Sequence, residues 1–166
     1  VFLSQTDSKG KSNAQELKVT DIESPSTWHG VTVANGHVVA IDWRDKRLVG
    51  DLSLNNFKAL SSLDVSRNHL TSLSVSGNVA LTNLNASHNK LKQIDLTGCS
   101  SLDRVAINNN RLTDFVVTDV PALKYLNCSQ NFIVDLDVRN STSLQTLYCQ
   151  SCRLENLYLS GCKNLS

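Results

Sequence analysis

The side chains of this 166-residue chain that are best suited to chemistry are its five cysteines. Cys149 and Cys152 form a Cys-x-x-Cys pair, and Cys162 follows nearby. Thiolates at this spacing could hold a zinc ion or exchange a disulfide. A zinc site needs further ligands, however, and neither a second close pair nor a histidine completes the set. A redox pair needs a helix N-terminus or a βα unit that lowers a thiol pKa, and the surrounding sequence predicts neither.

The histidines give little support for catalysis. His69 and His88 fall in neighbouring segments of the chain, but no serine–histidine–aspartate arrangement and no pair of carboxylates accompanies them. Two histidines without such partners are typical of a polar surface. The sequence therefore predicts no catalytic residue and no metal site, and it predicts no cofactor.

A strict internal repeat must position all of these side chains. Leucine recurs at one constant interval, as Leu60, Leu81, Leu102, Leu123, Leu144 and Leu165. The unit reads L-x-x-L-x-[VAIC]-x-x-[NC]-x-[LI]-x-x-[LIF]-x-[VL], followed by a short linker. Within it, Leu63-x-Val65 alternates apolar and polar residues, so a short strand sends its apolar side chains to one face. One strand cannot bury that face alone, and stacked units would form a parallel sheet over a continuous apolar core.

This pattern resembles the leucine-rich repeat over residues 38–166, and the 21-residue units are similar to those of bacterial internalins, which include cysteine-containing repeats. The resemblance implies an α/β-type solenoid that is predominantly β, curved and right-handed, with a concave parallel β-sheet. It also implies that the asparagine at the ninth position, replaced by Cys152 in the fifth unit, bonds backbone groups in the turn after the strand. The second half of each unit alternates as well, so we expect extended or 3₁₀ backbone on the convex side.

The repeat also accounts for the cysteines. Cys128 and Cys149 share an inward position of adjacent units, and Cys99 and Cys162 share a linker position. An odd count without a close-set framework does not indicate a disulfide scaffold. The pattern favours buried, reduced thiols that pack as small apolar residues.

The segment 1–59 differs from the repeats. In its polar part, 1–27, Ser12-x-x-Gln15 predicts the cap of a short helix that runs through Leu17 and Val19. In the part 28–59, Asn35-Gly36 stands between two β-rich runs and predicts a hairpin that covers the end of the solenoid.

The first unit, from Ile41 to Leu63, is one residue longer than the units that follow it. Trp43 faces inward by register and is expected to belong to the cap. Lys46 stands where later units have asparagine, which predicts an irregular turn.

This stretch resembles the N-terminal cap of plant-type leucine-rich-repeat proteins in Trp28-x-Gly30-Val31, in Asn35-Gly36 and in Leu48-x-Gly50. Plant caps carry a cysteine where Val33 stands, so here packing alone must hold the cap. Residues 60–166 then hold five repeats and the start of a sixth at Leu165. A C-terminal cap is absent from this sequence, which predicts an open end.

Binding is expected at the solvent-facing positions of each unit, which are the third, fifth, seventh, eighth and tenth. The seventh position holds Ser66, Ser87 and Ser129. Exposed aromatic residues beside arginines are typical of protein interfaces, and aromatic faces beside amides also suit sugar rings. The predicted ligand-binding residues on the concave face are Arg67, His88, Arg104, Arg111, Tyr125, Phe132, Tyr148 and Arg153.

Composition narrows the classes of partner. The chain has 16 basic and 15 acidic residues and no long basic stripe in its sequence, so we expect no nucleic acid. No apolar run approaches the roughly 18 residues of a membrane span, so we expect no membrane insertion. The chain begins at Val1 without a signal-peptide pattern, and we expect a secreted or cell-surface bacterial protein whose signal peptide has been removed.

The sequence therefore predicts a non-catalytic module that binds a protein or a glycan on the concave sheet. Two alternatives stay open. The repeats could form a structural spacer that self-associates through the open C-terminal end. The solenoid could also be a carbohydrate-active enzyme, which would need acids and bases clustered on one sheet.

Overall fold

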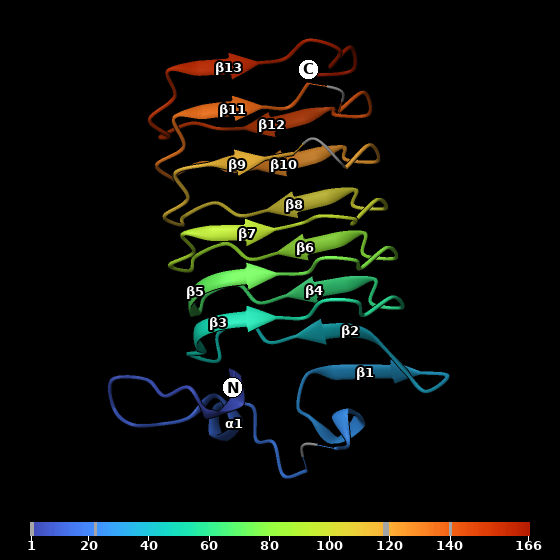
Figure 1. Cartoon of the computed structure of the whole chain (residues 1–166), viewed down its shortest axis with the longest axis vertical. Coiled ribbons are helices and arrows are strands. Elements are labelled where there is room, and N and C mark those ends of the chain that lie inside the picture. The colour runs from blue at the N-terminus through green and yellow to red at the C-terminus, as the bar shows by residue number, and fades with distance from the viewer. Residues whose placement is uncertain (1, 22, 118–119, 140) are drawn as a thin grey trace.

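The computed structural model describes residues 2–21, 23–117, 120–139 and 141–166. Figure 1 shows a column of stacked coils that rises from a cap at the N-terminal end to a last coil at the C-terminal end. Each coil contributes one strand to a large sheet, and the strands of the second half of the coil run in the opposite direction on the other side of the column.

The large sheet has seven strands in the order β1-β2-β4-β6-β8-β10-β12. They are β1 (Val31–Ala34), β2 (His37–Asp42), β4 (Ser62–Asp64), β6 (Asn83–Asn85), β8 (Arg104–Ala106), β10 (Tyr125–Asn127) and β12 (Thr146–Tyr148). Two smaller sheets have the orders β3-β5-β7 and β9-β11-β13. Their strands are β3 (Val49–Ser53), β5 (His69–Ser74), β7 (Gln93–Asp95), β9 (Phe115–Val116), β11 (Asp135–Asp137) and β13 (Asn156–Tyr158).

The repeat sets the register of the parallel strands. Leu63 pairs with Leu84, Leu84 with Val105, and Leu126 with Leu147, so each coil lies over the next with a shift of one unit. The predicted parallel-sheet solenoid, predominantly β, is confirmed. The expectation of extended backbone in the second half of the unit is confirmed too, since that half forms the strands of the smaller sheets.

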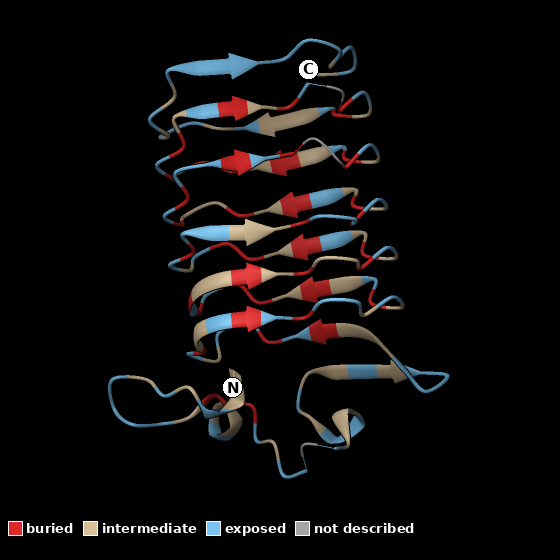
Figure 2. Ribbon diagram, viewed as in Figure 1, coloured by how far each residue is buried: buried red, intermediate tan, exposed pale blue. Residues whose placement is uncertain are grey.

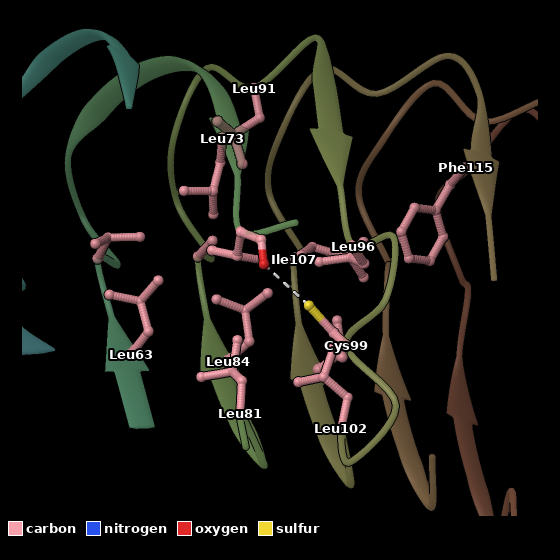
Figure 3. Close-up of a cluster of buried hydrophobic side chains, with 14 of the residues drawn as sticks. Leu63, Leu73, Leu81, Leu84, Leu91, Leu96, Cys99, Leu102, Ile107 and Phe115 are labelled. Atoms are coloured by element: carbon pink, nitrogen blue, oxygen red, sulfur yellow. Dashed lines mark hydrogen bonds between the residues drawn. The ribbon is translucent and has the colours of Figure 1, made fainter. Parts of the chain in front are cut away.

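The apolar positions of both halves meet inside the column. Figure 2 shows the buried residues at the middle of the strands and along the inward side of the turns. Figure 3 shows leucines of successive coils stacked on one another, with Phe115 filling the same interior. This is the continuous core that a single coil could not form alone.

A ladder of buried or half-buried asparagines closes the turns between the two halves. Asn110 donates from Nδ2 to the carbonyl oxygens of Ala86 (3.0 Å) and Ile107 (2.9 Å), and its Oδ1 accepts from the Leu91 N–H (3.0 Å). Asn68, Asn89 and Asn131 make the equivalent bonds in their coils. Each asparagine thus satisfies backbone groups of its own coil and of the preceding one, where unpaired groups would be costly.

A second ladder lies in the linker on the opposite side of the column. Asn78 Nδ2 donates to the Leu54 carbonyl (2.9 Å), and Cys99 Sγ donates to the Val75 carbonyl (3.1 Å), the bond drawn in Figure 3. Cys162 Sγ donates to the Val138 carbonyl (3.2 Å). Val120 occupies this position without a donor, and the buried hydroxyl of Ser141 has no hydrogen-bond partner among the described residues.

The gap in the second ladder coincides with a break between the two smaller sheets. β7 and β9 belong to adjacent coils but are not paired, and Figure 1 shows them farther apart than the neighbouring strands of that side. A groove of about 420 Å³ lies between them, lined by residues that include Ile94, Leu96, Phe115 and Val120. We call this break the β7–β9 seam.

The N-terminal cap covers the first coil through a hairpin and an aromatic stack. β1 and β2 pair antiparallel, and Asn35 and Gly36 both have positive φ (50° and 74°), as a type I′ turn requires. The predicted hairpin is confirmed. Trp43 is buried between Phe2 and Trp28, with ring centroids at 6.2 Å and 6.3 Å, which confirms its place in the cap.

The polar N-terminal segment packs against the first coil. Short 3₁₀ turns span Phe2–Ser4 and Pro25–Thr27, and α1 (Asn13–Glu16) starts at the predicted Ser12–Gln15 capping box. The buried Asn13 bonds both the N–H and the carbonyl of Val49.

The predicted extension of the helix through Leu17 and Val19 is wrong. Lys18 has a φ of 53°, and the Val19 N–H donates back to the Ala14 carbonyl, which closes the helix in a left-handed cap. The turn at Lys46 is irregular as expected, since Arg47 has a positive φ (55°) that no described tenth-position residue of the later coils shares.

Candidate functional site

In the three-residue strands of the large sheet, the first and third residues form the outer face because the middle residue points into the core. In β8 and β10, Val105 and Leu126 are buried while Arg104 and Asn127 face outward. Parallel pairing sets Arg104 beside Tyr125 and Tyr125 beside Thr146. We call this surface the large-sheet face.

Three predicted site residues meet on the large-sheet face. The Arg104 guanidinium carbon lies 3.6 Å from the Tyr125 ring centroid, so the cation stacks on the aromatic face. The Tyr125 and Tyr148 rings meet edge to face, with centroids 5.8 Å apart and an interplanar angle of 62°. Arg104 is exposed, Tyr125 is half-buried and Tyr148 is 44 % exposed. These three residues form the sheet-face stack.

Three other predicted residues lie together on an edge of the column. Arg111, Phe132 and Arg153 occupy the tenth position of successive units, at the start of the second half of the coil. The Arg153 guanidinium carbon lies 4.7 Å from the Phe132 ring centroid, and the Phe132 side chain is 41 % exposed. The tenth position also contains His69, which begins β5 in a smaller sheet. This edge therefore adjoins the large-sheet face rather than belonging to it.

Arg67 and His88 lie in the turns that follow β4 and β6. Both have a φ of 56°, and Asn109, Gln130 and Ser151 repeat this left-handed conformation in the later coils. The Arg67 N–H donates to the Ser87 carbonyl, and the His88 N–H donates to the Asn108 carbonyl, while both side chains are exposed. Arg67 stands four coils from Tyr148, roughly 19 Å at about 4.8 Å per coil, so it does not contact the sheet-face stack.

The seventh-position serines are not on the surface, contrary to the prediction. Ser66, Ser87 and Ser129 are between 5 % and 8 % exposed. Their hydroxyls donate to the side-chain oxygens two residues earlier: Ser66 to Asp64 (2.6 Å), Ser87 to Asn85 (2.8 Å) and Ser129 to Asn127 (2.7 Å). The local hydrogen bond tightens the turn and draws the serine inward. The side-chain oxygens of Asp64, Asn85 and Asn127 on the large-sheet face thus already accept a hydrogen bond from within the chain.

The acids of the large-sheet face are engaged in the same way. Asp64 also accepts from the Asn85 amide (3.2 Å), and Asp42 forms an ion pair with Arg44. The Arg44 guanidinium lowers the pKa of the Asp42 carboxyl, which is therefore a stable anion at neutral pH. Asp42 and Asp64 thus use their carboxylates in local bonds at the ends of β2 and β4.

The cysteines are structural. All five thiols are free, and Cys152 Sγ donates to the Cys128 carbonyl (3.3 Å), replacing one bond of the asparagine ladder. Burial raises the pKa of Cys99, Cys128 and Cys149 above the usual range, so these groups are thiols rather than thiolates. Within the described part of the chain, no group of three or more His, Cys, Asp or Glu side chains is placed to hold a metal ion.

The described part of the chain has no helix long and apolar enough to span a bilayer.

Comparisons with known proteins identify the fold. No protein-family model and no curated protein matches the chain. Among solved structures, the chain is similar to the crystal structure of the BIR2 ectodomain from Arabidopsis thaliana. The two share 18 % sequence identity with a TM-score of 0.62, over 93 % of this chain and 90 % of that chain. BIR2 is a plant leucine-rich-repeat protein, and at this identity the likeness establishes a leucine-rich-repeat type of solenoid fold and nothing about the ligand.

Proposed function

We propose that this protein is a non-catalytic module that binds a partner protein on the large-sheet face. The sheet-face stack is the observation that carries the proposal. Arg104, Tyr125 and Tyr148 are held by three neighbouring strands and by mutual ring contacts. A rigid scaffold presents them with little conformational entropy left to lose on binding, which is the property of an interface hot spot.

The rest of the large-sheet face supports binding rather than catalysis. A carbohydrate-active solenoid would need free acids and bases on one sheet. Here Asp42 is paired with Arg44, and Asp64 accepts three bonds from Ser66 and Asn85. A glycan remains the second ligand class for the same face, because Tyr125 and Tyr148 beside Asn127 suit a sugar ring.

The proposal includes the extracellular or cell-surface location and the bacterial source expected from the sequence. The BIR2 structure is that of an ectodomain, and an extracellular or cell-surface location suits a protein that displays a binding face. The resemblance of the repeat units to bacterial internalin repeats supports a bacterial source. The predicted residues Arg67, His88, Arg111, Phe132 and Arg153 would then surround the sheet-face stack along the edge of the ligand footprint.

A binding screen against arrayed extracellular proteins and glycans tests this function. The wild type is compared with Tyr125→Ala/Tyr148→Ala, and Tyr158→Ala on β13 serves as a matched control for the loss of an exposed tyrosine (42 % exposed). A protein ligand lost in the double variant and kept in the control supports the proposal. A ligand bound equally by all three chains, each with a wild-type circular dichroism spectrum, would contradict it.

Self-association is a second candidate because the last coil exposes apolar side chains. Leu157, Tyr158 and Leu159 are 41 %, 42 % and 38 % exposed, and Figure 2 shows β13 exposed along its whole length. A second copy stacked on this coil would bury them. Light scattering decides between the two: a mass that stays monomeric from micromolar to millimolar concentration excludes the self-association.

A further inference from the structure

One edge of the column carries a row of basic side chains that the linear sequence disperses. The tenth position of each unit faces outward at the turn from the large sheet to the smaller sheets. From the first coil to the last, this position holds Arg47, His69, Lys90, Arg111, Phe132 and Arg153. We call this row the edge ridge.

Backbone hydrogen bonds fix the edge ridge rung by rung. The His69 N–H donates to the Leu48 carbonyl (2.7 Å), the Lys90 N–H to Leu70 (2.9 Å) and the Arg111 N–H to Leu91 (2.8 Å). The Phe132 and Arg153 N–H groups continue the series to Leu112 and Ile133. Neighbouring rungs are therefore about 4.8 Å apart, and the five intervals span roughly 24 Å.

The ridge side chains all point into solvent. The first five are each followed by a fully buried apolar residue, and Arg153 is followed by the half-buried Leu154. From the second coil to the fifth, each is also preceded by a buried or half-buried asparagine. With its neighbours turned inward, the side chain at the tenth position must face outward, and all six members are exposed.

No carboxylate of the described residues forms an ion pair with a charge of the ridge. The ion pairs within 4.0 Å among the described residues are Lys11–Glu16, Arg44–Asp42, Lys124–Asp103 and Arg139–Asp137. None of them includes a ridge residue. The Arg153 guanidinium instead lies over the Phe132 ring, which leaves its N–H edges free to bind an anion.

The first rungs of the ridge line a shallow hollow of about 520 Å³. Arg47, His69 and Lys90 border it, and the N-terminal segment adds Lys9 and Asp7. The Asp7 carboxylate accepts from the backbone N–H groups of Lys9 and Lys11, which hold its pKa below the usual range. The hollow thus has an excess of basic groups even with this acid counted. Arg67 and His88 flank the same stretch from the eighth position.

The spacing of the rungs distinguishes among anionic ligands. Side chains on one face of an extended peptide recur at roughly 6.6 Å, and the phosphates of a DNA strand in a duplex at about 3.4 Å. Neither matches a row at about 4.8 Å per rung. A chain of linked sugar rings can present one anionic group per ring or per pair of rings, and Phe132 offers an apolar surface for a ring face. We propose that the edge ridge binds a linear anionic polysaccharide.

This site is distinct from the sheet-face stack, although Arg111, Phe132 and Arg153 also border the proposed protein footprint. The sheet-face stack consists of outward residues of β8, β10 and β12, whereas the ridge follows the turn beyond the strand ends. The carboxylate or sulfate groups of the polysaccharide would bind Lys90, Arg111 and Arg153 by charge-assisted hydrogen bonds. Such binding would hold the protein on an anionic matrix while the large-sheet face stays available.

Titration of the whole chain with defined polymers tests the proposal. Polygalacturonate supplies carboxylates, dextran sulfate supplies sulfates, and neutral dextran and single-stranded oligo-dT are the comparison probes, all at about 150 mM NaCl, near physiological ionic strength. The ridge variant is Lys90→Gln/Arg111→Gln. The matched control is Lys58→Gln/Lys163→Gln, which removes the same charge from exposed positions off the ridge.

The ridge variant is expected to bind at least one of the two anionic polysaccharides about tenfold more weakly, since two charged contacts are lost. The slope of log affinity against log salt should fall by about 2, while the control pair keeps the wild-type slope. Tyr125→Ala/Tyr148→Ala should bind the polysaccharide as the wild type does, which separates this proposal from the protein-binding one.

Three results would overturn the inference. The first is the absence of binding to both anionic polymers. The second is an equal loss in the ridge and control variants, which would mean that only net charge matters. The third is oligo-dT binding as tight as that of either polysaccharide, which would assign the ridge to nucleic acid.

Discussion

The asparagine ladder predicts a large loss of stability from a single buried amide. Replacing Asn110 by alanine removes its bonds to the Ala86 and Ile107 carbonyls and to the Leu91 N–H, all at 3.0 Å or less. Three net hydrogen bonds of about 1 kcal/mol each give a loss of about 3 kcal/mol. Most of it arises because the Leu91 N–H, beside a fully buried side chain, loses its acceptor.

Urea unfolding followed by circular dichroism measures this loss. With a slope of about 1–3 kcal/mol per M, the midpoint should fall by about 1–3 M while the slope itself stays unchanged. A loss within the roughly 0.5 kcal/mol typical of surface substitutions would refute the role given to the ladder.

The chain itself contains the matched comparison for this variant. Cys152 stands at the asparagine position and keeps the equivalent donation to a carbonyl of the preceding coil, that of Cys128. Asn110→Cys should therefore lose only about 2 kcal/mol, since one of the three bonds survives. The reverse change, Cys152→Asn, adds an amide oxygen that can accept from the Ile133 N–H and should stabilise by about 1 kcal/mol. The reasoning fails if the cysteine variant proves less stable than the alanine variant.

Three further predictions concern the cap, the acids and the thiols. Gly30→Ala should destabilise the cap by about 1–3 kcal/mol, because φ at Gly30 is +82° and the new Cβ would overlap the Asp42 carbonyl oxygen. Thermal unfolding measures this loss, and a variant more stable than the wild type would contradict the prediction. The pKa of Asp95 lies below its usual 3.8 because the Thr97 N–H and the Thr97 and Ser74 hydroxyls donate to the carboxylate. Its stabilisation is thus complete above pH 3.8 and lost as the pH falls through the lowered pKa, so the melting temperatures of wild type and Asp95→Asn should converge below about pH 4. Iodoacetamide should label the partly exposed Cys149, Cys152 and Cys162 in the folded chain. It should label the buried Cys99 and Cys128 only after unfolding, and mass spectrometry identifies the labelled sites.

The repeat made the solenoid predictable. A strict period fixes which residues pair, and the observed register of Leu63 with Leu84 follows from it directly. The hairpin was equally predictable, because Asn35-Gly36 between two β-rich runs is a local signal for a type I′ turn. Helix α1 was predicted less well, since it ends at the left-handed backbone of Lys18. A glycine at this position would have indicated the end of the helix, but the residue there is a lysine.

The surface was less predictable than the core. Alternation suggested that Ser66, Ser87 and Ser129 face solvent, but their hydroxyls bond the residue two positions earlier and turn inward. The edge ridge is also hidden in the linear sequence, because a whole repeat separates each member from the next. Aligning the units and reading the tenth residue of each, including Arg47 of the longer first coil, would have revealed it.

The β7–β9 seam has a consequence for how the column would respond to tension. Pulled from its two ends, a solenoid is a set of interfaces loaded in series, each holding only its neighbours. Among the described residues, the interface between the coils of β7 and β9 keeps its strand pairing in the large sheet but has none in the smaller sheets, and Val120 supplies no side-chain bond across it. This interface should yield first, so a polymer bound to both Lys90 and Arg111 would span the weakest interface and hold its two coils together.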